Sequence, residues 1–152
     1  MPSVNSIHLH IQTGGQSGAG TDGDVYLGLC GREFWIDSTR DDFERGAGRE
    51  YVLGDGANIR NADFNDPRSQ RLFTENVAKF PVYIRFQPRS RTDNWQVQRA
   101  DVRFNESLHI DWDTVNFMEN KPAEGIWLGV RSGLFLHLEN FSHDPIQLKP
   151  SK

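Results

Sequence analysis

The chain is poor in cysteine, in long apolar runs and in positive charge. Cys30 is its only cysteine in 152 residues, so neither an intrachain disulfide nor a zinc site built on several cysteines can form. The first residues carry no basic cluster and no apolar run typical of a signal peptide or a membrane-spanning helix, and we therefore expect a cytoplasmic location. The net charge of −4 gives no general attraction to nucleic acid, which we exclude as the main partner.

The composition supports one packed core. Hydrophobic residues make up 36% of the chain and aromatic residues 11%, which is too much apolar material for a disordered chain. Because roughly 100–200 residues usually form one domain, we expect a single domain over residues 1–152.

Alternation of apolar and polar residues is the dominant pattern and predicts strands. It occurs over residues 7–11, 25–29, 82–86, 108–112 and 134–138. In a longer run, from Trp95 to Phe104, the apolar phase shifts near Gln98 and Arg99, which predicts a β-bulge. No long amphipathic helix separates the runs, so the fold class is all-β, an antiparallel β-sandwich. One short helix is expected over residues 66–79, with Asp66 as its N-cap.

A glycine-rich segment, Gly18-Ala19-Gly20-Thr21-Asp22-Gly23, matches the pattern of dinucleotide-binding loops. In those folds a helix follows the loop and its N-terminus holds the phosphates. Here a strand pattern follows, and Asp22 and Asp24 would repel a phosphate. We therefore predict no nucleotide site.

Acidic side chains gather in the expected loops and at strand ends, where they could supply oxygen ligands to calcium. These residues are Asp22, Asp24, Asp37, Asp41, Asp42, Glu44 and Asp93. The other interpretation is that the loops are only solvated. His8 and His10 share one strand face and could form half of a zinc or copper site. No G-x-S-x-G elbow is present, so the motifs give no support to enzyme activity, and an enzyme built on His8 and His10 is kept as an alternative.

Two further features favour contact with a partner. Trp35 lies between Phe34 and Ile36, and in a strand it points away from them, toward solvent. Arg89 and Arg91 belong to a loop in a locally basic stretch. A covered tryptophan and a solvated basic loop are the alternative interpretations.

Several motifs, in order along the chain, resemble the PLAT domain family, named for polycystin, lipoxygenase and alpha-toxin. They are residues 7–14 (IHLHIQTG), 18–27 (GAGTDGDVYL), 42–46 (DFERG), 82–86 (VYIRF), 93–97 (DNWQV) and 126–128 (IWL). The resemblance implies eight strands in two four-stranded sheets. It also implies a non-catalytic module that binds a membrane or a protein partner, often through calcium.

The resemblance also implies ligand sets. One calcium position would use Asp37, Asp42 and the carbonyls of Thr21, Ser38 and Arg40, with Asp41 and Glu44 as further ligands. A second position would use backbone oxygen from Gly20 and Asn94 with the Asp93 carboxylate. Trp35, Arg89 and Arg91 would contact lipid headgroups or a protein partner. The alternative function is a calcium-independent protein-interaction module of the stress type.

Overall fold

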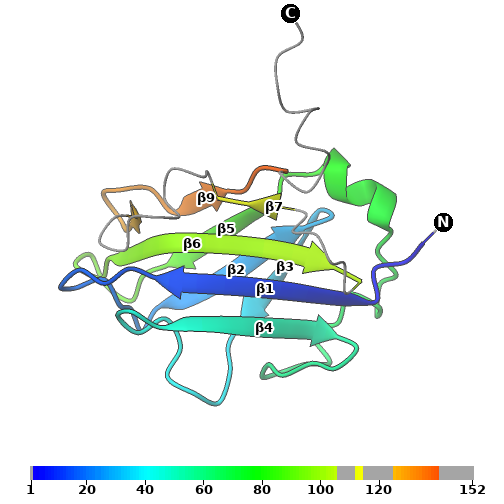
Figure 1. Ribbon diagram of the computed structural model, residues 1–152, viewed down its shortest axis with the longest axis horizontal. Coiled ribbons are helices and arrows are strands. Elements are labelled where there is room, and N and C mark those ends of the chain that lie inside the picture. The colour runs from blue at the N-terminus through cyan, green and yellow to red at the C-terminus, as the bar shows by residue number, and fades with distance from the viewer. Residues whose placement is uncertain (1, 106–111, 115–124, 141–152) are drawn as a thin grey trace, which may run out of the picture.

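The computed structural model describes residues 2–105, 112–114 and 125–140, and these form two antiparallel sheets packed face to face (Figure 1). The predicted all-β sandwich is confirmed. Alternation produces this arrangement because each strand presents its apolar residues to the facing sheet and its polar residues to water.

The first sheet has β4 (Gly48–Gly54), β1 (Ser6–Thr13) and β6 (Trp95–Phe104) side by side. Two short strands, β7 (Trp112–Asp113) and β8 (Ile126–Leu128), pair with opposite ends of the same edge of β6. The described residues therefore contain nine strands and not the predicted eight, because β7 and β8 both occupy the place next to β6 in the sheet. Most of the predicted 108–112 strand lies outside the described residues, and only Trp112 belongs to β7.

The second sheet has the predicted four strands. They follow the order β3 (Arg32–Ile36), β2 (Asp24–Leu29), β5 (Tyr83–Gln87) and β9 (Phe135–His137), and all pairs are antiparallel. The β9 strand is shorter than the predicted run over residues 134–138.

The predicted bulge is confirmed. Gln12 of β1 lies opposite Arg99, whereas Thr13 lies opposite Val97, so Gln98 is the additional residue in β6. One extra residue reverses the faces of a strand. The bulge thus allows Val97 and Ala100, on its two sides, both to be fully buried.

Trp95 is the largest fully buried side chain of the core. Its ring contacts Phe43 and Phe86 at centroid distances of 5.3 and 5.6 Å. Its indole Nε1–H donates to Thr13 Oγ1 at 3.0 Å, which satisfies the one polar atom of the ring. Since Phe43 follows Asp42 directly, this core contact also supports the loop that precedes β4.

The predicted helix over residues 66–79 is wrong in its length and in its cap. The structure has turns followed by one short 3-10 helix, η1 (Thr74–Lys79), with no side-chain cap. The Asp66 carboxylate instead accepts bonds from the Arg68 backbone and guanidinium, and Arg71 adopts a positive φ of 45°, which ends regular helix geometry. In the described part of the chain, no helix is long and apolar enough to cross a bilayer.

The strand β4 was not predicted. Its inward residues Tyr51 and Leu53 are buried, and they lie between Gly48 and Gly54, at the two ends of the strand. With only two inward apolar residues, the alternation is too short to predict a strand from the sequence.

Candidate functional site

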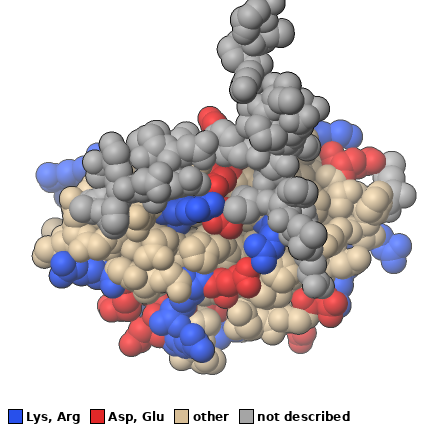
Figure 2. Space-filling view, viewed as in Figure 1, with Lys and Arg blue, Asp and Glu red and all other residues tan. Residues whose placement is uncertain are grey.

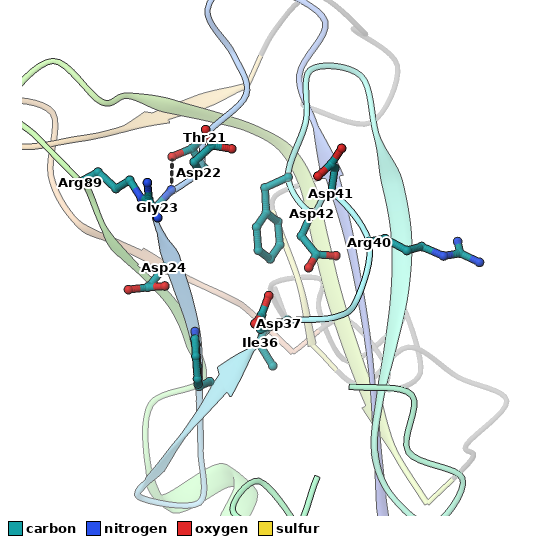
Figure 3. A pocket seen from close by; sticks show the side chains of 12 residues that line it. Thr21, Asp22, Gly23, Asp24, Ile36, Asp37, Arg40, Asp41, Asp42 and Arg89 are labelled. Carbon is teal, nitrogen blue, oxygen red and sulfur yellow. Dashed lines mark hydrogen bonds between the residues drawn. The ribbon is translucent and has the colours of Figure 1, made fainter. Parts of the chain in front are cut away.

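The loops before β2 and after β3 enclose a cavity of about 340 Å³ at one end of the sandwich (Figure 3). Most of its lining is polar. The lining residues are Thr21, Asp22, Gly23, Asp24, Trp35, Ile36, Asp37, Arg40, Asp41, Asp42, Phe43 and Arg89. The structure thus brings together Thr21, from one loop, and the acidic residues that follow β3, as the resemblance implied.

Asp37 and Asp42 point toward each other in this cavity (Figure 3). Asp42 is held firmly, because its carboxylate accepts hydrogen bonds from Ser38 N at 2.8 Å, Ser38 Oγ at 2.7 Å and Tyr51 Oη at 2.9 Å. Asp37 directly follows β3, so the strand fixes its backbone. Hydrogen bonds therefore fix the position of the Asp42 carboxylate, and the end of strand β3 fixes the backbone of Asp37.

The electrostatics of this pair are unfavourable without a cation. Partial burial and the negative charge of Asp42 raise the pKa of Asp37. A carboxyl whose pKa is higher in the folded than in the unfolded state destabilises the fold as pH rises through its titration. The nearest compensating charge is Arg60, whose Nε lies 3.7 Å from Asp37 Oδ2 and donates to the Ser38 carbonyl at 2.8 Å.

Several carbonyl and carboxylate oxygens at the cavity, which could bind a cation, accept no hydrogen bond from the described residues. They are the carbonyls of Thr21 and Arg40 and the carboxylates of Asp22, Asp24 and Asp41. Asp22 and Asp24 were expected among the possible calcium ligands of the acidic loops, but neither belongs to the two ligand sets that the resemblance implies. Their closeness to Thr21 in the sequence, on either side of Gly23, could have predicted that they line the same cavity.

A second cavity, of about 380 Å³, adjoins the first and shares Thr21, Asp22 and Arg89 with it. Glu44 lines this second cavity together with Gly20 and not the first one, so the structure does not bring Glu44 to the Asp37–Asp42 pair.

Asp93 also lines the second cavity, but both of its carboxylate oxygens are engaged. Thr21 Oγ1 donates to Oδ1 at 2.6 Å and Arg89 N donates to Oδ2 at 2.8 Å. Asn94 lines neither of these two cavities. The second calcium position stays a prediction, and it would have to use an aspartate that already organises the loop.

Thr21→Val tests that organising role. The Thr21 hydroxyl donates to Asp93 and accepts from Gly23 N at 2.9 Å, and valine keeps the shape without either bond. We expect a loss of about 1–3 kcal/mol in the free energy of unfolding, measured by urea unfolding. Thr21→Ser, which keeps the hydroxyl, should stay close to the parent, and equal losses in both variants would contradict the role of the hydroxyl.

Of the predicted partner contacts, two lie at the cavity. Trp35 is half-buried and lines it, as does Arg89, whereas Arg91 is exposed and lines neither this cavity nor the second one. Three further arginines on the strands that flank the loop of Arg89 and Arg91 form ion pairs with acidic side chains. Arg85 pairs with Glu33, Arg99 with Asp101 and Asp113, and Arg103 with Glu50.

The histidine alternative receives no support from the described residues. His8 and His10 lie on the outer face of the first sheet, where their Nδ1 atoms are 4.0 Å from Glu50 and 3.6 Å from Asp101. Acidic and basic side chains are mixed on this face (Figure 2). Nowhere in the described ranges do three or more His, Cys, Asp or Glu side chains gather as a metal site.

No family model and no curated protein matches the chain. Solved structures do match. The alpha-toxin of Clostridium perfringens is 19% identical with a TM-score of 0.61, over 90% of this chain and 32% of that one. The alpha-toxin of Clostridium absonum is 21% identical with a TM-score of 0.56, over 91% and 32%. Coral 8R-lipoxygenase is 15% identical with a TM-score of 0.55, over 94% and 19%.

The chain thus spans about a third of the length of the toxins and about a fifth of the lipoxygenase. The coral structure is described as showing calcium activation via a C2-like domain, which is a statement about that enzyme. Identities of this size establish the fold alone. The chain therefore has the PLAT-like β-sandwich fold that its motifs predicted.

Proposed function

We propose that the chain is a non-catalytic, calcium-binding module that attaches to an anionic lipid surface. The observation that carries the proposal is the Asp37–Asp42 pair, two carboxylates held face to face beside backbone carbonyls that accept no hydrogen bond among the described residues. Repulsion within this pair favours the arrival of a cation.

The donor set fits calcium. Calcium takes roughly six to eight oxygen ligands in flexible geometry, and backbone carbonyls and water serve as well as carboxylates. Asp37 and Asp42 would supply the charge, and Thr21, Ser38 and Arg40 would supply carbonyls. This set needs only two carboxylates, so it does not require the three-side-chain cluster that the described residues lack. Magnesium is less suited to a site of loop carbonyls, because it demands near-octahedral geometry.

The surroundings of the cavity suit a lipid headgroup. Trp35 lines it, and an indole ring is favourable at headgroup depth. Arg89 lines it as well and forms no side-chain hydrogen bond or ion pair among the described residues. An arginine near an anionic leaflet contributes about 1 kcal/mol. A bound calcium ion would offer its remaining ligand positions to lipid phosphate. The calcium activation described for the coral lipoxygenase supports this proposal.

Vesicle sedimentation tests the proposal. We expect the protein to bind phosphatidylcholine vesicles that contain phosphatidylserine in the presence of calcium and to be released by a chelator. Arg89→Gln should weaken binding, because it removes a cation at the cavity. Arg131→Gln makes the same charge change at an exposed residue that does not line the cavity, and it should bind like the parent. Calcium-independent binding, or equal loss in the two variants, would contradict the proposal.

One observation favours the alternative, a calcium-independent protein-interaction module. Arg60 already places a guanidinium beside Asp37 and on the Ser38 carbonyl, where it partly takes the place of a metal charge. This alternative predicts that calcium changes neither the melting temperature nor vesicle binding, and that Trp35→Ala abolishes capture of the protein partner.

A further inference from the structure

We infer that a third cavity, between β4 and the loop over residues 38–41, binds a phosphate group. Its volume is about 440 Å³. It lies on the β4 side of the loop whose other residues line the Asp37–Asp42 cavity, and Arg40 contributes to both. The inference concerns an anion site and does not depend on the calcium proposal.

The walls of this cavity are held by specific contacts. Asn58 continues the free edge of β4, because its Oδ1 accepts from Val52 N at 2.8 Å and its Nδ2 donates to the Glu50 carbonyl at 3.1 Å. Two residues later, Arg60 joins the same segment to the loop after β3 through Arg60 N and the Asp37 carbonyl, 2.9 Å apart. The segment therefore ties β4 to the loop and keeps the space between them defined.

Arg49 has one donor atom that lacks a partner in the part of the chain that the structure describes. It lies opposite the buried Ile11 in the β1–β4 register, so its side chain starts on the face turned toward the other sheet. Its Nη2 donates to the Asp41 carbonyl at 3.1 Å, which holds the guanidinium against the loop over residues 38–41. Its Nε is buried and has no hydrogen-bond partner among the described residues. A buried N–H without an acceptor is costly, so the protein leaves the Arg49 guanidinium incompletely satisfied.

Arg40 and Thr39 add further donors on the other wall. The Arg40 side chain points away from Asp37 and Asp42 and toward β4 (Figure 3). Neither the Arg40 guanidinium nor the Thr39 hydroxyl has a hydrogen bond or ion pair among the described residues. The cavity thus holds a guanidinium from each wall and a hydroxyl.

The charge of the lining selects an anion. Glu50 is the one acidic residue among the described residues of the lining. It is engaged elsewhere, with Arg103 Nη2 at 3.0 Å and His8 Nδ1 at 4.0 Å. Within the lining, two guanidinium groups therefore face one carboxylate, and Asp42 lies behind it, where it accepts hydrogen bonds from Ser38 and Tyr51. A phosphate has several acceptor oxygens in a tetrahedral array, which can take bonds from two guanidinium groups and a hydroxyl together. A free phosphate and a phosphomonoester lipid headgroup share this chemistry.

Melting curves with inorganic phosphate test the site, with chelator present so that calcium plays no part. At constant ionic strength, phosphate should raise the melting temperature relative to chloride. Arg40→Gln should weaken the phosphate affinity by about tenfold or more, the size expected for a lost hydrogen bond to a charged group. Arg49→Lys, which keeps the charge but removes the planar guanidinium fork, should also weaken it. Arg131→Gln serves as the control for charge and should match the parent.

Vesicles distinguish the two sources of phosphate. Phosphatidylcholine vesicles with and without phosphatidic acid are sedimented with the protein in chelator. Binding that needs phosphatidic acid and is lost in Arg40→Gln assigns the site to a lipid headgroup, whereas phosphate stabilisation without vesicle binding assigns it to a free phosphate. The inference is overturned if neither probe has an effect, or if Arg40→Gln and Arg131→Gln respond alike.

Discussion

Asp37→Asn should abolish the calcium-induced rise in melting temperature and leave the calcium-free protein folded. A ligand at about 100 times its Kd stabilises by about 2.7 kcal/mol, or roughly 5–10 °C for a chain of this length. Asparagine removes one of the two charges that would hold the ion. It also removes a partly buried charge and its repulsion with Asp42, which raise the pKa of Asp37 in that order of size, so the melting temperature in chelator should stay level or rise.

Three variants make this result specific. Asp63→Asn changes an exposed aspartate that does not line the cavity and should respond to calcium like the parent. Arg60→Gln removes the cation nearest Asp37 and should tighten calcium binding, because a guanidinium and a divalent ion repel each other at short range. Asp37→Asn combined with Asp42→Asn should show no calcium response. A response of the Asp37→Asn variant equal to that of the parent would refute the site.

Trp95→Ala should cost about 3–5 kcal/mol of unfolding free energy, the range for removing a large buried aromatic side chain. The indole is fully buried, contacts the rings of Phe43 and Phe86, and donates to Thr13 Oγ1. Its loss would leave a cavity at the junction of the two sheets and an unpaired hydroxyl. Urea unfolding of the variant and the parent measures the cost.

Phe64→Ala is the control for this prediction. Phe64 is 82% exposed, and surface substitutions usually change stability by less than about 0.5 kcal/mol. A loss below about 1 kcal/mol for Trp95→Ala would contradict the assigned packing. Because Phe43 follows Asp42, we also expect Trp95→Ala to weaken any calcium response more than Phe64→Ala does.

Much of the fold could be predicted from the sequence, because a strand that is buried on one face shows apolar and polar residues in alternation. The strands β1, β2 and β5 and the bulge at Gln98 follow from that pattern. The strands β7 and β8 have two and three residues, too few to show a period. The helix over residues 66–79 failed because local bonds of Asp66 with Arg68 compete with helix formation.

The candidate site was only partly within reach of the sequence. The resemblance implied that Thr21, Asp37 and Asp42 belong to one ligand set, and all three line one cavity in the structure. Arg60 was missed because its position depends on the path of the segment after β4, which no periodicity encodes. Glu44 lines the second cavity and not the first, and only the loop geometry decides which way its side chain faces.

A calcium titration of the chelator-stripped protein, followed by melting temperature with magnesium as the control, tests whether the Asp37–Asp42 cavity binds calcium. We expect a rise in melting temperature that saturates with calcium, is much smaller with magnesium and is absent in Asp37→Asn. An unchanged melting temperature at millimolar calcium, or an equal rise with both metals and in the variant, would contradict it.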